Sequence, residues 1–413
     1  MSEDKRAKNL SGISGREFLG DDAGIAAKTA AAKEAEKEFP EEKFSLTHLT
    51  LKIDGETLKY TATTGRMQMR DPSGKIKSNI FFTAYVQDKQ EDKSRRPITF
   101  AFNGGPGSSS IWLHLGALGP QRVLLTEEGK ALPPPYKLVP NEYTWLDFTD
   151  LFFIDPVGTG YSRSAPGIDP KEFYGVKEDV ESVGEFIRLY VTRYKRWLSP
   201  KFIAGESYET TRTAGLSAYL QNGVGMNLNG LFLISSVLNF QTISFTPDND
   251  LPFILYLPSY TCAAWYHRKL SPELQADLPR TRMEVEQFAL NDYLLALAKG
   301  NELTATKANR LWNWQSGIEQ MGYVNVATTL QRAMSENKVL KVFVASGYYD
   351  LDTAYFATKY TADHLRLDPS LREHITLSYY DAGHQMYTHL PSLKKLKADV
   401  ATFFKKALAN VAK

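Results

Sequence analysis

Three residues of this 413-residue chain could together carry out nucleophilic acyl transfer. In chain order they are Ser207, Asp350 and His384. Ser207 follows a short apolar run and precedes a segment that can begin a helix, so we expect it on a sharp strand-to-helix turn. A hydroxyl on such a turn projects from the backbone. Asp350 and then His384 follow further along the chain. His384 would act as general base for Ser207, and Asp350 would fix the tautomer of His384 and stabilise its imidazolium.

Each of these residues also has a purely structural interpretation. Ser207 and Asp350 could cap helices, and His384 could be an ordinary loop residue. A lone serine beside a glycine is a weak signal. Serine, acid and histidine in this order, each placed after an expected strand, form a much stronger one. We therefore predict a Ser-His-Asp catalytic triad.

A glycine-rich segment, with the sequence NGGPGSSS at residues 103–110, follows another expected strand. Glycines let backbone N–H groups approach a developing oxyanion without a Cβ in the way. We predict that the N–H groups of Gly105 and Tyr208 form this oxyanion hole. A phosphate-binding loop is the alternative, but Gly-Lys-Ser/Thr is missing and Pro106 removes a donor. A second glycine-rich turn, residues 155–162, could be structural or could line a substrate site.

Hydrophobic patterning predicts the strands and helices around these residues. β-Rich segments broken by turn sequences come first and are expected to pair antiparallel. From about residue 97, strands alternate with helices, which implies a mainly parallel sheet with active groups at the carboxyl ends of strands. The expected strands are residues 47–53, 58–63, 79–85, 98–102, 151–154, 201–204, 231–235, 342–345 and 375–379. The predicted fold class is α/β, an α/β-hydrolase fold with flanking helices and an inserted helical cap.

The same patterning predicts how the chain divides. Residues 1–40 are charged and poor in large apolar groups, so we expect a flexible tail. Residues 41–238 and 339–413 would form the two parts of the hydrolase core. Residues 239–338, where the strand signal fades, would form the helical cap. The aromatic residues of that cap are Trp265, Tyr266, Phe288, Tyr293, Trp312 and Trp314.

The composition excludes several classes of function. A net charge of +2 gives no indication of nucleic-acid binding, and no apolar run approaches the roughly 18 residues that span a bilayer. The single cysteine, Cys262, rules out an internal disulfide. Four histidines lack metal-ligand spacing, so neither a metal nor another cofactor is predicted. They are His114, His267, His364 and His389.

Taken together, these motifs resemble the serine carboxypeptidase family (peptidase S10), and within it the bacterial branch. The similarity runs from about Phe39 to the C-terminus. Its motifs are NGGPGSSS at 103–110, GALGP at 116–120, DPVGTG at 155–160, GESY at 205–208, SGYYD at 346–350 and AGH at 382–384. The resemblance implies removal of C-terminal residues from peptides with a free C-terminus, through an acyl-enzyme. It also implies that Asn103 and Glu206 bind the carboxylate of the substrate.

Three departures from the family pattern bear on activity. Eukaryotic members have a second glutamate where this chain has Ala117, so the carboxylate clamp is expected to be thinner. Glu209 occupies a position that is usually glycine or alanine, and its side chain should either crowd the turn or point into the cleft. The cap between Leu297 and Trp312 is shorter than expected for the bacterial branch, which would leave a more open site.

Two alternative functions remain. An esterase or acyltransferase would use the same triad with a different acceptor, and a catalytically weak relic would keep the triad without turnover. The first residues lack the apolar core of a signal peptide. The chain would then be cytoplasmic, unless a leader has been removed, in which case the family resemblance suggests a periplasmic or secreted protein.

Overall fold

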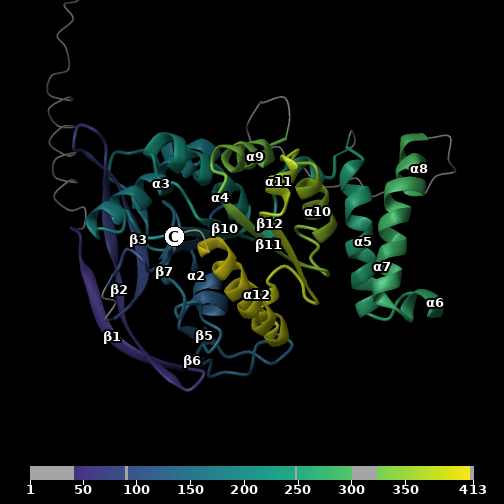
Figure 1. Ribbon diagram of the computed structural model, residues 1–413, viewed down its shortest axis with the longest axis horizontal. Coiled ribbons are helices and arrows are strands. Elements are labelled where there is room, and N and C mark those ends of the chain that lie inside the picture. The colour runs from purple at the N-terminus through teal and green to yellow at the C-terminus, as the bar shows by residue number, and fades with distance from the viewer. Residues whose placement is uncertain (1–40, 89–91, 247–248, 300–322, 410–413) are drawn as a thin grey trace, which may run out of the picture.

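The computed structural model describes residues 41–88, 92–246, 249–299 and 323–409 (Figure 1). Its main sheet has the strand order β1-β2-β3-β7-β4-β9-β10-β11-β12, and β8 pairs with β3. The strands of this sheet are β1 (Phe44–Ile53), β2 (Glu56–Arg70), β3 (Ile76–Gln87), β4 (Ile98–Phe102), β7 (Asp150–Ile154), β8 (Arg163–Ser164), β9 (Lys201–Ser207), β10 (Gly230–Ser236), β11 (Lys341–Gly347) and β12 (Ile375–Tyr380). A separate two-stranded sheet joins β5 (Gln121–Val123) to β6 (Leu138–Pro140).

The sheet has an antiparallel edge and a parallel centre, as the sequence predicts. β1, β2 and β3 pair antiparallel, and β3 pairs antiparallel with β7. The β1–β2 turn consists of Asp54 and Gly55, both with positive φ, which is the two-residue hairpin turn that Asp-Gly favours. From β7 onward every neighbouring pair is parallel. The carboxyl ends of β4, β9, β10, β11 and β12 therefore meet at one edge.

Helices cover both faces of the parallel part. The longer ones are α3 (Val176–Arg193), α4 (Tyr208–Ala218), α5 (Leu251–Tyr266), α7 (Leu278–Phe288), α9 (Ala327–Glu336), α10 (Tyr355–Asp363) and α12 (Leu390–Leu408). The shorter ones are α2 (Ile111–Leu113), α6 (Pro272–Gln275), α8 (Leu294–Lys299), α11 (Pro369–Arg372), η1 (His114–Leu118), η2 (Pro170–Phe173), η3 (Tyr219–Gly223), η4 (Phe240–Thr242), η5 (Ala289–Tyr293) and η7 (Met386–Thr388).

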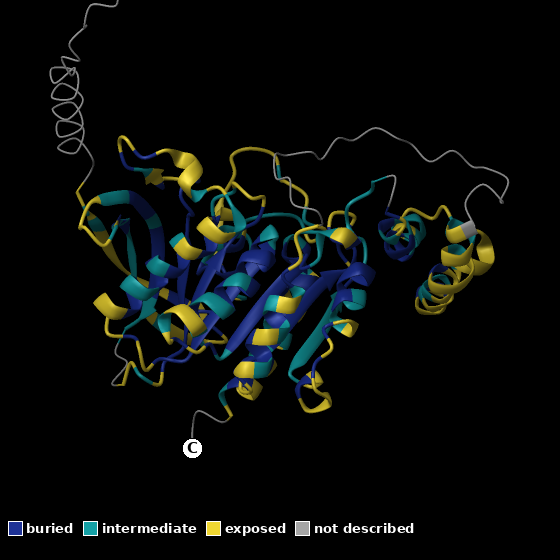
Figure 2. Ribbon diagram, turned by 90° about the horizontal axis from the view of Figure 1, so that it is seen from above, coloured by how far each residue is buried: buried dark blue, intermediate teal, exposed yellow. Residues whose placement is uncertain are grey.

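Successive side chains of a strand point to opposite faces of the sheet, and this divides the core into two layers. Ile203 of β9 packs in one hydrophobic cluster with α3, α4 and α9, whereas its neighbour Phe202 packs in a second cluster with α12. The central strands are consequently buried on both faces (Figure 2). Parallel strands between two helical layers form the α/β-hydrolase architecture, so the predicted fold class is confirmed.

The helices between β10 and β11 lie in two places. Figure 1 shows α5 to α8 beyond α10, at the end of the sheet opposite β1. α9 instead packs on α4, and its Leu330 belongs to the main core. The division into tail, core and cap stays a prediction. The predicted tail, Trp312, Trp314 and the shortened part of the cap lie outside the described residues. None of the helices within the described ranges is long and apolar enough to cross a membrane.

Candidate active site

Ser207 ends β9 and immediately precedes α4. Its φ of 59° and ψ of −128° lie in a region that a non-glycine residue rarely adopts, which gives the sharp turn expected from the sequence. Gly205 makes the turn possible, because a Cβ there would lie 2.5 Å from the Thr213 hydroxyl of α4. As the first residue of α4, Tyr208 has a backbone N–H without an intrahelical partner. The turn thus presents a hydroxyl and an N–H donor together.

The glycine loop after β4 packs directly against this turn. A Cβ on Gly104 would lie 2.6 Å from Cβ of Ser207 and 2.7 Å from the carbonyl oxygen of Glu206. Gly105 follows with a φ of 133°, which favours glycine. The structure therefore brings Gly104 against the turn that carries Ser207 and Tyr208, and Gly105 is the next residue of the loop. Their role as an oxyanion hole stays a prediction.

Asp350 and His384 are hydrogen-bonded to each other. His384 Nδ1 lies 3.0 Å from Oδ2 of Asp350, and the Asp350 carboxylate is fully buried. That carboxylate also accepts the N–H groups of Asp352 and Thr353, each at 2.9 Å, and the Thr353 hydroxyl at 2.8 Å. Burial alone would lower the pKa of His384, but hydrogen bonding to Asp350 and the charges of Asp350 and Glu206 raise it to about 9. Asp350 thus orients the imidazole and favours its cation.

Backbone contacts hold the loops of the acid and the histidine together. The N–H of Tyr349 donates to the carbonyl of Ala382 at 3.0 Å. Gly347 permits this approach, because a Cβ there would contact the carbonyl oxygens of Ala382 and Gly383. The Ser235 hydroxyl of β10 contacts the backbone carbonyl of His384.

Ser207 lies at the same edge of the sheet as this pair. β9 and β10 are neighbours, and Ser207 pairs in register with Ser236. Within the described parts of the chain, no hydrogen bond joins the Ser207 hydroxyl to the His384 imidazole. Such bonds are often long without substrate and tighten in the reacting complex. The geometry is consistent with a triad whose Asp–His half is assembled, and the triad assignment stays a prediction.

Glu206, Asn103 and Tyr387 form a buried polar cluster beside the elbow. Asn103 donates its side-chain N–H to Oε2 of Glu206, and the Tyr387 hydroxyl lies 2.8 Å from the same oxygen. Burial raises the pKa of Glu206 to about 7, against the lowering effects of His384, Tyr387 and Asn103. Sequence reasoning places Asn103 and Glu206 together but misses Tyr387. The sequence signal that could have identified Tyr387 is its position, three residues after His384.

The second glycine-rich turn, residues 155–162, supports the first, residues 103–110. Asp155 accepts the backbone N–H of Ser110 at 2.9 Å, and the Ser162 hydroxyl donates to the Asp155 carbonyl at 2.5 Å. Burial raises the pKa of the Asp155 carboxyl, while the backbone N–H groups of Ser110 and Tyr161 oppose the shift. Of the two roles left open by the sequence, these contacts favour the structural one.

Glu209 does not point into a cleft, so that alternative from the sequence is wrong. Its side chain is fully buried in an ion pair with Arg212, one turn further along α4. Arg212 in turn donates two hydrogen bonds to Asp179 of α3, at 2.7 and 2.8 Å. The turn accommodates the charged residue because a buried cation lies beneath it.

His114, one of the four histidines without metal-ligand spacing, has structural surroundings. His114 stacks on Phe153 with ring centroids 4.4 Å apart and lies 2.7 Å from the Tyr85 hydroxyl, and burial lowers the pKa of His114 to about 4. Among the residues that the structure describes, no group of three or more potential ligands could hold a metal ion.

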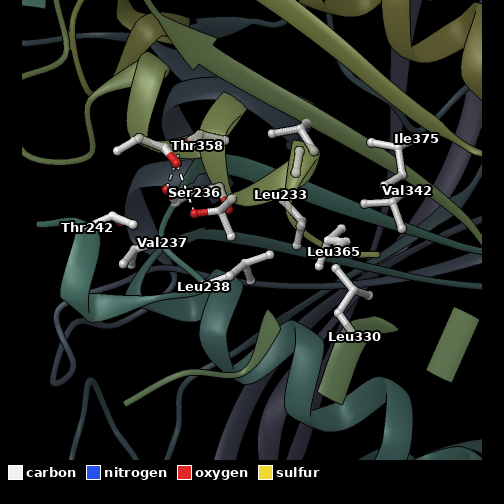
Figure 3. A pocket seen from close by; sticks show the side chains of 14 residues that line it. Leu233, Ser236, Val237, Leu238, Thr242, Leu330, Val342, Thr358, Leu365 and Ile375 are labelled. Carbon is white, nitrogen blue, oxygen red and sulfur yellow. Dashed lines mark hydrogen bonds between the residues drawn. The ribbon is translucent and has the colours of Figure 1, made fainter. Parts of the chain in front are cut away.

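A cavity between the sheet and two helices contains none of the predicted site residues (Figure 3). Leu233 of β10 and Val342 of β11 line it on one side, and Leu330 of α9 and Thr358 of α10 on the other. The cavity has room for about one water molecule. We interpret it as a packing gap in the core, too small for a substrate.

Comparison of the sequence with known proteins finds the serine carboxypeptidase family, which the motifs also resemble. A family model described as serine carboxypeptidase matches residues 56–244. Serine carboxypeptidase-like 36 of Arabidopsis thaliana is 29% identical over 180 residues, which cover 42% of this chain and 34% of the relative. The lysosomal protective protein of Mus musculus is 28% identical over 179 residues, which cover 42% and 34%. The chain thus spans about a third of the length of these curated relatives, and Asp350 and His384 lie outside the family match.

Comparison of structures extends over nearly the whole chain. The prohormone-processing carboxypeptidase KEX1 of Saccharomyces cerevisiae aligns over 89% of this chain and 93% of its own, with a TM-score of 0.53 and 16% identity. At that identity the likeness concerns the fold alone.

Proposed function

Since this chain belongs to the serine carboxypeptidase family, we propose that it is a serine-type carboxypeptidase that removes C-terminal residues from peptides. The observation that carries the proposal is a buried carboxyl, Glu206, directly beside Ser207 and paired with Asn103. A carboxyl group donates a hydrogen bond to a carboxylate only when it is protonated. A pKa of about 7 keeps Glu206 protonated in mild acid. A peptide with a free C-terminus would gain from this contact, whereas an ester or amide would not.

The proposed chemistry proceeds in two transfers. Ser207 Oγ attacks the carbonyl carbon of the last peptide bond while His384 takes the hydroxyl proton. The oxyanion receives hydrogen bonds from the N–H groups of Gly105 and Tyr208. The C–N bond breaks, His384 gives its proton to the leaving amine, and the C-terminal amino acid departs. Water, activated by His384, then hydrolyses the acyl-enzyme and restores the Ser207 hydroxyl.

The burial of Asp350 supports its place in this scheme. Asp350 accepts two backbone N–H groups and a hydroxyl in addition to His384, so hydrogen-bond donors surround its buried carboxylate. It can therefore stabilise the imidazolium that forms when Ser207 loses its proton. The raised pKa of His384 is the expected consequence.

The test compares three substrates that differ only at the C-terminus. An N-blocked dipeptide with a free carboxylate, its C-terminal amide and a simple ester are assayed with the wild type and with Ser207→Ala. We expect preference for the free acid, lost in the variant. Ester cleavage alone would indicate an esterase or acyltransferase. Turnover of none of the three, together with no labelling of Ser207 by a fluorophosphonate, would indicate a relic site.

A further inference from the structure

Tyr387 closes a hydrogen-bonded triangle around Glu206. The Tyr387 hydroxyl lies 3.0 Å from Oε1 and 2.8 Å from Oε2 of Glu206, and the Asn103 amide donates to Oε2. The three residues are 1–3% exposed, so water does not replace these bonds. They come from three separate parts of the fold: Tyr387 from η7, Glu206 from β9 and Asn103 from the loop after β4. The cluster is a built polar site within the core.

The ring of Tyr387 is fixed in place by the helix that follows the glycine loop. A Cβ on Gly116 would lie 2.9 Å from Cε2 of the Tyr387 ring, so the ring occupies the space that a side chain at position 116 would need. Ala117, the position at which the family resemblance leads one to expect a second acid, belongs to the same buried cluster as Tyr387. Tyr387 therefore supplies a polar partner for Glu206 in the part of the site where Ala117 supplies none.

Asn103 is held as firmly as Tyr387. Its side-chain oxygen accepts the backbone N–H of Leu113 at 2.8 Å, which directs its amide nitrogen toward Glu206. Oε2 of Glu206 thus lies within reach of two donors, Asn103 and Tyr387. In a neutral carboxyl, the oxygen that carries no proton is the better acceptor of two hydrogen bonds. The Asn103 bond to Oε2, and the shorter distance from the Tyr387 hydroxyl to Oε2 (2.8 Å) than to Oε1 (3.0 Å), therefore favour the proton of Glu206 on Oε1.

We propose that Tyr387 is a positioning residue that fixes which oxygen of Glu206 carries its proton and so directs the Oε1–H toward the carboxylate of a substrate. This inference rests on the proposed function, because the substrate carboxylate is the acceptor. Tyr387 acts through Glu206, because its hydroxyl is bonded to that carboxyl and the residue is only 1% exposed.

The charged groups that face Glu206 determine the pH dependence of this arrangement. His384 and the hydrogen bonds from Tyr387 and Asn103 favour its ionised form, whereas burial and Asp350 favour its protonated form. Loss of the Tyr387 hydroxyl removes one of the groups that stabilise the anion. The titration of Glu206 should then move to higher pH.

The experiment measures KM and kcat for the blocked dipeptide acid from about pH 5 to about pH 9 in the wild type, Tyr387→Phe and Glu206→Gln. Tyr387→Phe keeps the ring and removes only the hydroxyl. We expect KM at pH 5 to rise about three- to tenfold, the worth of one hydrogen bond, with kcat unchanged within about twofold. We also expect the rise of KM with pH to shift to higher pH. In Glu206→Gln the KM should not vary with pH, and adding Tyr387→Phe should introduce no shift.

Tyr380→Phe is the matched control. Tyr380 is equally buried, but its hydroxyl donates to Asp399 of α12 at 2.9 Å. This variant should leave the pH profile of KM unchanged. A wild-type profile in Tyr387→Phe, or an equal fall of kcat in both tyrosine variants, would overturn the proposal.

A measurement without turnover separates this inference from the proposed function. Difference infrared spectroscopy detects the carboxyl band that Glu206→Gln removes, and its titration reports the protonation of Glu206. If the wild type cleaves no free-acid peptide, the proposed function fails on its own. The titration of that band should still move to higher pH in Tyr387→Phe, and an unmoved titration would refute the role of Tyr387.

Discussion

Glu209 and Arg212 form an ion pair that is buried on both sides, directly beneath the turn that carries Ser207. Arg212 also makes a bidentate contact with Asp179, and its guanidinium lies 5.2 Å from the ring centroid of Phe102. Among the described residues, the Glu209 carboxylate has no polar partner apart from Nη1 of Arg212. The Arg212 guanidinium therefore compensates two buried carboxylates, those of Glu209 and Asp179. Its two hydrogen bonds go to Asp179.

This arrangement predicts unequal effects of the two substitutions. Arg212→Met leaves two buried carboxylates without a cation and should cost about 3–5 kcal/mol of unfolding free energy. Glu209→Gln leaves the Arg212–Asp179 pair intact and should cost less than about 1 kcal/mol. Chemical denaturation of both variants measures the difference. Equal losses would show that Glu209 is the main partner of Arg212.

Glu209→Gly should leave kcat unchanged within about twofold for the fraction of protein that is folded. The side chain of Glu209 has no exposed surface, so it cannot contact a substrate. Steady-state kinetics with an active-site titration by fluorophosphonate gives kcat per folded molecule. A rise of kcat would show that the buried side chain crowds the elbow.

The KM for peptides with a free C-terminus should rise about tenfold per pH unit above about pH 7, because Glu206 loses the proton that it donates to the substrate. Over the same range kcat should not fall, because the general base His384, whose pKa is raised to about 9, gains its unprotonated form as pH rises. The KM for an ester that lacks the C-terminal carboxylate serves as the control and should stay constant. A flat KM for the free acid between about pH 5 and about pH 9 would rule out the carboxylate clamp.

Much of this site follows from local sequence patterns. Apolar runs and turn residues predict the strands that end before Ser207, Asp350 and His384, and all of these strands are present. Glycines mark the loops that approach the elbow, because only a residue without a Cβ fits there.

Contacts between distant segments are not contained in such patterns. Tyr387 contacts Glu206 across 181 residues of chain, and its position three residues after His384 indicates the site but not the carboxylate partner. The direction of Glu209 depends likewise on Asp179 and Arg212, which meet only once α3 and α4 pack together. The packing of α3 on α4 therefore decides whether the Glu209 side chain enters the core or the cleft.

The raised pKa of Glu206 also predicts a pH-dependent change of stability. Because burial raises this pKa from 4.5 to about 7, the folded state binds the proton more tightly than the unfolded state. The contribution of protonated Glu206 to stability is fully present below the pKa of Glu206 in the unfolded chain. It is lost as pH rises through about 7, the pKa in the folded state. Glutamine does not titrate, so Glu206→Gln should gain stability relative to wild type across this range, by at most about 3 kcal/mol. Thermal unfolding at a series of pH values measures this gain, and a constant difference would contradict the shift.

Gly104→Ala should reduce kcat/KM about a hundredfold, because the added methyl group has no room at the elbow. Its Cβ would lie 2.6 Å from Cβ of Ser207 and 2.7 Å from the Glu206 carbonyl oxygen. The backbone of the glycine loop or of the turn must then move, and a displacement of about 1 Å near reacting atoms costs on the order of 10² in rate.

Gly223→Ala is the matched control for this substitution. A Cβ on Gly223 would meet only the Tyr219 ring, at an ordinary contact distance of 3.7 Å, and both residues lie in η3 after α4. Kinetics of the two variants with the blocked dipeptide acid, beside their thermal unfolding, distinguishes local misplacement from loss of fold. Wild-type kcat/KM in Gly104→Ala would mean that the loop can shift without displacing Ser207, and that the close approach of Gly104 is dispensable.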